Sequence, residues 1–219
     1  MRHLIYLHGF ASSARSTKAI AFAAKAAEAG WSFACPDLNL PEFESLTITR
    51  MIGQVSDAVA ASPAPRVALV GSSLGALVAL EAAVRAQPGS EPPIDALVFL
   101  APALDLAPGM ERHLGPAAME RWERTGALDV FHFGDERTRS LQWTFMEDAR
   151  RYDPQQTVTT LPVLIYQGRR DQVVDAAVVT GWAARQPRAI LHLLDDDHQL
   201  LTSLDLMWAG TRAFLTEAA

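Results

Sequence analysis

The chain has 219 residues, a length that suits one α/β domain. Hydrophobic residues make up 49% of it and charged residues 20%, so a full core can be buried and an intrinsically disordered chain is excluded. The net charge is −6, and arginine supplies 17 of the 19 basic residues, which are scattered along the chain. A basic surface for nucleic acid or for anionic lipid is therefore not expected.

The N-terminus imitates a signal peptide, because Arg2 precedes the apolar run Leu4–Leu7. That run is too short, since export requires an apolar region of about 7–15 residues. The longest strongly apolar stretch without charge, Val67–Leu80, is also too short to cross a bilayer. Cys35 is the only cysteine, so an intrachain disulfide is excluded and nothing points to an oxidising compartment. We therefore expect a cytoplasmic protein without a transmembrane segment.

Short β-rich runs alternate with longer Ala-rich segments, which is typical of a parallel sheet with helices on both faces. Strands are predicted at His3–Leu7, Ser32–Pro36, Arg66–Val70, Ala96–Leu100, Val163–Gln167 and Ile190–Leu194. Helices are predicted at Ser16–Ala29, Ser45–Ala61, Leu74–Ala86, Val173–Ala184 and Leu200–Thr216. The predicted fold class is α/β, with a compact, mostly parallel six-stranded sheet in one domain over residues 1–219.

One interval, from Leu104 to Pro154, interrupts this alternation. Its charge density rises, strand-like runs almost vanish, and aromatic residues are interspersed with Arg and Glu. An insertion of about fifty residues is far longer than a crossover between parallel strands requires. We expect it to form a cap over one end of the sheet. Trp143 and Phe145 would diverge by about 200° on a helix, so only one of them is expected to touch a ligand.

The strongest chemical signal is the G-x-S-x-G run from Gly71 to Gly75. Chance would produce roughly 0.04 such matches in a chain of this composition. The run directly follows a predicted strand and opens a predicted helix, the setting in which a sharp turn presents a serine hydroxyl beyond the sheet. Ser73 is therefore the candidate nucleophile. The alternative is a tight turn in which Ser73 merely caps the helix.

A serine hydroxyl needs a base, and His198 is the candidate. It follows the last predicted strand, within the run Asp195–Leu200, at the same carboxyl-terminal edge of the sheet as Ser73. The alternatives are a solvated histidine and a metal site built from the aspartate run, although no partnering His or Cys lies nearby. The other histidines fall within strands, in the insertion or in the first turn: His3, His192, His113, His132 and His8.

The base needs a carboxylate that fixes its tautomer, and Asp171 is the candidate. It follows the predicted strand Val163–Gln167 at the same edge of the sheet. Asp105 and Asp175 are its rivals, and a purely structural helix cap would also explain Asp171. Backbone N–H groups must also bind the oxyanion formed on a substrate carbonyl. Leu74, after the nucleophile, and Phe10, after the first strand, are the expected donors.

These residues resemble the α/β-hydrolase superfamily, in which the triad follows the chain order Ser, Asp, His. Within it the sequence is similar to small bacterial serine esterases whose first strand leads into an H-G-F-x-S-S loop, here His8–Ser13. The likeness spans the whole chain, including Gly71–Gly75, Gly168–Val174 and Asp197–His198. The pair of N-terminal strands found in larger members is missing, which leaves a sheet edge less protected and is compatible with a homo-oligomer.

The resemblance implies a serine hydrolase, a carboxylesterase or thioesterase that acts on small acyl substrates. The insertion is expected to supply the acyl pocket, or else only a satellite core, through Trp122, Phe133, Trp143 and Phe145. No metal and no organic cofactor is implied. Two alternatives stay open: a serine peptidase or amidase with the same triad, and a non-catalytic binding protein on the same fold. Serine at position 73 excludes the Asp or Cys nucleophile of dehalogenase or dienelactone chemistry.

Overall fold

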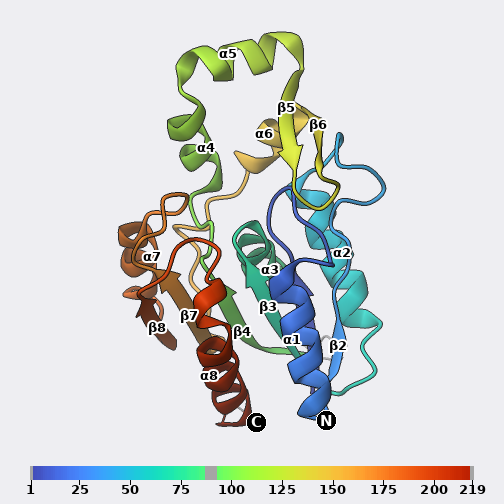
Figure 1. Ribbon diagram of the computed structural model, residues 1–219, viewed down its shortest axis with the longest axis vertical. Helices are drawn as coiled ribbons and strands as arrows, with labels where there is room; N and C mark the ends of the chain where they lie inside the picture. Colours follow the sequence, from blue (N-terminus) through green and yellow to red (C-terminus); the bar gives the residue numbers. More distant parts are fainter. Residues whose placement is uncertain (1, 87–92, 218–219) are drawn as a thin grey trace.

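The computed structural model describes residues 2–86 and 93–217 (Figure 1). Its main feature is a six-stranded sheet in the order β2-β1-β3-β4-β7-β8, in which every neighbouring pair is parallel. The strands are β1 (His3–Leu7), β2 (Ser32–Ala34), β3 (Val67–Ser72), β4 (Ile94–Leu100), β7 (Val163–Gly168) and β8 (Ala189–Leu194). All six predicted strands are confirmed, with shifts of at most two residues at their ends.

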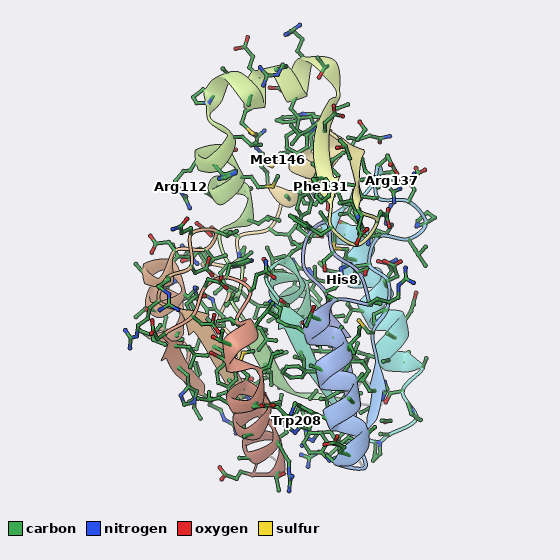
Figure 2. The ribbon with its side chains drawn as sticks, viewed as in Figure 1. His8, Arg112, Phe131, Arg137, Met146 and Trp208 are labelled. Atoms are coloured by element: carbon green, nitrogen blue, oxygen red, sulfur yellow. The ribbon has the colours of Figure 1, made fainter. Side chains whose placement is uncertain are left out.

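Helices cover both faces of this sheet, as predicted. The helices α1 (Thr17–Glu28) and α8 (Leu204–Glu217) share one face, where Trp208 of α8 packs edge-on against Phe22 of α1 (Figure 2). The other face is covered by α2 (Ile48–Ala60), α3 (Leu74–Arg85) and α7 (Ala176–Ala183). The first nine residues of α3 are buried, which confirms that this apolar helix lies in the interior.

Local capping explains where α7 departs from its predicted start. The side chain of Asp175 accepts a hydrogen bond from the Ala177 N–H, so α7 begins at Ala176 rather than at Val173. The segment predicted as one helix from Leu200 divides into a short 3-10 turn, Leu201–Ser203, and α8. Within the described residues, no helix combines the length and the apolar character needed to cross a membrane.

Between β4 and β7 the chain forms α4 (Leu106–Leu114), α5 (Pro116–Thr125), β5 (Ala127–His132), β6 (Arg137–Gln142) and α6 (Thr144–Ala149). These elements stand beyond one end of the sheet, with α5 farthest from it (Figure 1). The antiparallel hairpin β5–β6 corrects the expectation that this interval lacks strands. Much of the hairpin is exposed, so its Arg, Asp and Thr residues hide the strand pattern.

Polar contacts hold this segment against the rest of the protein. The buried carboxylate of Asp148, on α6, accepts hydrogen bonds from the N–H (2.8 Å) and the hydroxyl (2.6 Å) of Thr49, in the first turn of α2. Arg139 of β6 binds both carboxylate oxygens of Glu44, at 2.8 and 2.5 Å. The turn of the hairpin is held as well, because the Phe133 N–H donates to the carbonyl of Ala11 at 2.8 Å.

We expect Asp148→Ala to lower the free energy of unfolding by about 0.5–2 kcal/mol, because the N–H and the hydroxyl of Thr49, in the first turn of α2, lose the carboxylate that accepts their hydrogen bonds. Urea unfolding followed by circular dichroism measures this change. Glu147→Ala is the matched control, since Glu147 is the exposed neighbour on the same helix. Equal stability of the two variants would show that the Asp148–Thr49 contact does not fix α6.

Candidate active site

Ser73 occupies a sharp turn between β3 and α3. Its backbone angles, φ 53° and ψ −116°, belong to a region that residues other than glycine rarely adopt. The motif needs glycine at both positions for steric reasons. A Cβ on Gly71 would overlap the backbone of Ala76, and a Cβ on Gly75 would overlap the carbonyl of Leu7. The predicted strand-turn-helix setting is thus present, and Ser73 is partly exposed whereas Ser72 is buried.

The loop after β1 lies directly against this turn. A Cβ placed on Gly9 would be only 3.4 Å from the Cβ of Ser73. The N–H groups of Phe10 and Leu74, the two expected oxyanion donors, have no hydrogen-bond partner in the described parts of the chain. Two free donors at a serine turn can bind a substrate oxygen that carries negative charge.

His8 fixes the shape of this loop, a role that the sequence analysis did not assign. Its imidazole is buried below the β5–β6 hairpin (Figure 2), with Nδ1 2.9 Å from the Gly9 carbonyl and Nε2 3.0 Å from the Leu38 N–H. Because Nε2 accepts the hydrogen bond from Leu38, we assign the proton to Nδ1, which donates to Gly9. Both ring nitrogens are therefore engaged with the backbone.

Asp171 and His198 form a direct pair at the carboxyl-terminal edge of β7 and β8. The Nδ1 atom of His198 lies 2.8 Å from Oδ2 of Asp171, whose side chain is fully buried, and the imidazole is 15% exposed. Gln167 donates to the same carboxylate oxygen, and the N–H groups of Val173 and Val174 donate to the other. Burial opposes ionisation of Asp171, but the hydrogen bonds from His198 and the backbone prevail and lower its pKa.

The two alternative carboxylates, Asp105 and Asp175, make other interactions. Asp105 forms an ion pair with Arg112 of α4, and Asp175 caps α7. Nor does the aspartate run before His198 build a metal site: in residues 2–86 and 93–217 no group of three or more His, Cys, Asp or Glu side chains could hold a metal ion. The arrangement instead offers a serine, an oriented imidazole and two backbone donors.

Close packing holds together the loops that carry Asp171 and His198. A Cβ on Gly168 would lie 2.5 Å from the Asp197 carbonyl, so only glycine permits this approach. The Arg170 N–H donates to the carbonyl of Asp196 at 3.0 Å. The buried carboxylate of Asp196 accepts hydrogen bonds from the hydroxyls of Thr202 and Ser203, which anchor the second loop to the 3-10 turn.

The four aromatic residues predicted to line a pocket occupy different surroundings. Phe145 of α6 is fully buried, with its ring 5.5 Å from the ring of Phe10. Trp122 is buried and donates from Nε1 to the Leu141 carbonyl, and Trp143 packs edge-on against it at 5.2 Å. Phe133, at the turn of the hairpin, is 72% exposed. Of the four, Phe145 and Phe133 lie beside the loop that follows β1.

Solved structures share this architecture along nearly the whole chain. A proposed hydrolase from Agrobacterium vitis S4 is 25% identical, with a TM-score of 0.85 over 97% of this chain and 87% of that protein. The mouse alpha/beta hydrolase domain-containing protein 10 is 22% identical, with a TM-score of 0.81 over 99% and 90%. The esterase Est1E from Butyrivibrio proteoclasticus, solved with ferulic acid, is 21% identical, with a TM-score of 0.81 over 100% and 89%.

These likenesses confirm the α/β-hydrolase fold that the sequence motifs predict. None of the curated proteins compared with this chain matches it. The family model of the uncharacterised protein family UPF0227 matches residues 3–208, which include β1, the serine turn and the Asp171–His198 pair. The chain therefore belongs to the UPF0227 family, on an α/β-hydrolase fold.

Proposed function

We propose that the protein is a serine hydrolase that cleaves small acyl esters or thioesters. The observation that carries the proposal is the 2.8 Å contact between His198 and the buried Asp171, at the sheet edge where the strained turn presents Ser73. An oriented imidazole at the same sheet edge as a presented serine is compatible with the arrangement that activates a hydroxyl. Structural neighbours that include an esterase support the same reaction class.

In the proposed reaction, Oγ of Ser73 attacks the acyl carbon while Nε2 of His198 takes the hydroxyl proton. Asp171 holds Nδ1–H and stabilises the imidazolium that forms. The N–H groups of Phe10 and Leu74 bind the oxyanion of the tetrahedral intermediate. His198 then gives the proton to the leaving alcohol or thiol, and water, activated by the same imidazole, releases the acid from Ser73.

The proposal extends to the surroundings of this site. Residues 1–219 would act as one domain in which the segment 104–154 caps the site and selects the acyl group. The contact between Phe145 and Phe10 supports this, because it connects α6 to the loop that binds the oxyanion. We place the reaction in the cytoplasm, in keeping with the single cysteine.

Replacing the nucleophile tests the reaction class. Ser73→Ala should lower the turnover of a p-nitrophenyl ester at least about a thousandfold while the melting temperature stays nearly unchanged, because one hydroxyl is lost and no packing. Ser72→Ala, the adjacent hydroxyl, should retain most of the activity. Comparable activity in Ser73→Ala and the wild type would contradict the assignment.

The identity of the acid is tested by two asparagine variants. Asp171→Asn should lower kcat by about 10³ to 10⁴, because the amide favours the wrong tautomer of His198. Asp105→Asn, which breaks only the ion pair with Arg112, should change kcat less than about threefold. The reverse order of losses would assign the acid to Asp105.

Acyl selectivity should depend on Phe145 rather than on Trp143. Phe145→Leu alters the packing of Phe10, so the preference among acetyl, butyryl and hexanoyl esters should shift by roughly 1 kcal/mol per methylene while acetyl hydrolysis persists. Trp143→Leu changes ring contacts with Trp122 and Arg150 instead of one with Phe10, and serves as the control. Identical chain-length profiles in the wild type and both variants would show that the acyl pocket lies elsewhere.

A further inference from the structure

The loop of residues 8–13 carries Phe10, a proposed oxyanion donor, in a shape that needs support. Ala11, directly after Phe10, has φ 50°, in the left-handed region that residues other than glycine rarely adopt. On one side the loop borders a cavity of about 170 Å³, which Ser13 lines together with residues 39–43 and Gly134. Packing is absent on that side, so the position of the loop depends on its hydrogen bonds.

Asn39 binds the loop from the segment that follows β2. Only 8% of Asn39 is exposed, and its Nδ2 donates to the carbonyl of Ser12 at 2.8 Å. A carbonyl only accepts hydrogen bonds, so we assign the amide nitrogen, and not the amide oxygen, to the side that faces Ser12. The N–H of the preceding residue, Leu38, donates to His8 at the start of the loop. Two consecutive residues thus hold the loop near both of its ends.

The turn of the β5–β6 hairpin, residues 133–136, binds the same loop from the cap and faces the sheet (Figure 1). The Phe133 N–H donates to the Ala11 carbonyl at 2.8 Å, and the Gly134 N–H reaches the same oxygen at 3.4 Å. The approach is close, because a Cβ on Gly134 would lie 2.8 Å from the Cβ of Ser13. Glycine is therefore required where the hairpin turn meets the loop.

We propose that Asn39 and the hairpin turn are positioning elements of the oxyanion site, which hold the loop 8–13 so that the Phe10 N–H stays aimed at the substrate oxygen. The inference rests on the proposed function, because positioning acquires a catalytic meaning only if this N–H binds an oxyanion. The two carbonyls that they hold, those of Ala11 and Ser12, follow Phe10 directly in the chain. The cap then serves the chemical step as well as the choice of acyl group.

A displaced oxyanion donor has a characteristic kinetic effect. Its hydrogen bond strengthens as negative charge develops on the substrate oxygen, so its displacement lowers kcat more than it changes KM. Complete loss of one donor costs about 10²–10³ in kcat, and a donor that only moves should cost about tenfold to a hundredfold. A residue that contributes to stability alone would lower the melting temperature and leave the kcat of the folded protein unchanged.

The first test compares Asn39→Ala with Gln54→Ala on one p-nitrophenyl ester. Gln54 is the matched control, because its side-chain amide donates to the Leu40 carbonyl at 3.0 Å and so binds the segment after β2. Asn39→Ala should lower kcat about tenfold to a hundredfold with KM within about threefold, whereas Gln54→Ala should keep kcat within about twofold of the wild type. Equal kcat in Asn39→Ala and the wild type would overturn the role of Asn39.

Asn39→Asp separates the hydrogen bond from the shape of the side chain, and it serves if Asn39→Ala fails to fold. The aspartate keeps the shape but turns an acceptor toward the Ser12 carbonyl, so kcat should fall at least as far as in Asn39→Ala. Wild-type kcat in Asn39→Asp would also overturn the role of Asn39.

The hairpin turn is tested by two replacements that compensate each other. Gly134→Ala places a Cβ against Ser13, so it should push the turn away from the loop and lower kcat about tenfold. Ser13→Gly removes the obstructing Cβ, so adding Gly134→Ala to a Ser13→Gly protein should change kcat less than about twofold. A loss of the same size in both backgrounds, or no loss in either, would overturn the role of the turn.

Hydrogen exchange, resolved by NMR, reads the support of the loop without a substrate. The Phe133 N–H should exchange about tenfold faster in Asn39→Ala than in the wild type, and at the wild-type rate in Gln54→Ala, because only Asn39 shares the loop with Phe133. Unchanged exchange in Asn39→Ala overturns the positioning role, even if the wild type cleaves esters. Faster exchange in a protein that cleaves no ester upholds the support of the loop and overturns the proposed function instead.

Discussion

The close approach of the first turn of α3 to the end of β1 is the constraint on which the site depends. Gly75 lies so near the carbonyl of Leu7 that a Cβ would overlap it. This contact forces the chain into a sharp turn, places Ser73 at φ 53°, and brings the loop that begins with His8 against the serine. The strain is tolerated because β1 and β3 are neighbours in a fully buried part of the sheet.

The sequence predicts most of the fold because the central strands are short apolar runs bounded by turn residues. The same reasoning fails for the hairpin β5–β6, whose half-exposed strands carry Arg137, Arg139 and Asp129. The hairpin is held by two groups from distant parts of the chain, the Glu44 carboxylate and the Ala11 carbonyl. Such long-range contacts leave no pattern in the sequence of the hairpin itself, so the hairpin could not be predicted from its own residues.

The candidate site, like the fold, is predicted only in part by the sequence. Topology predicts that residues following β3, β7 and β8 meet at one edge of the sheet, and the structure joins Asp171 to His198 there. The supporting roles of His8, Gln167 and Asp196 depend on tertiary contacts and have no sequence signal.

The most direct test of the central claim is covalent labelling with a fluorophosphonate, which reacts with an activated serine whatever the natural substrate is. We expect the wild type to be labelled at Ser73 alone, as mapped by mass spectrometry of its peptides. His198→Ala, which leaves the serine in place but removes its base, should react at least about a hundredfold more slowly. A label on another residue, or equal labelling rates in the two proteins, would contradict the account.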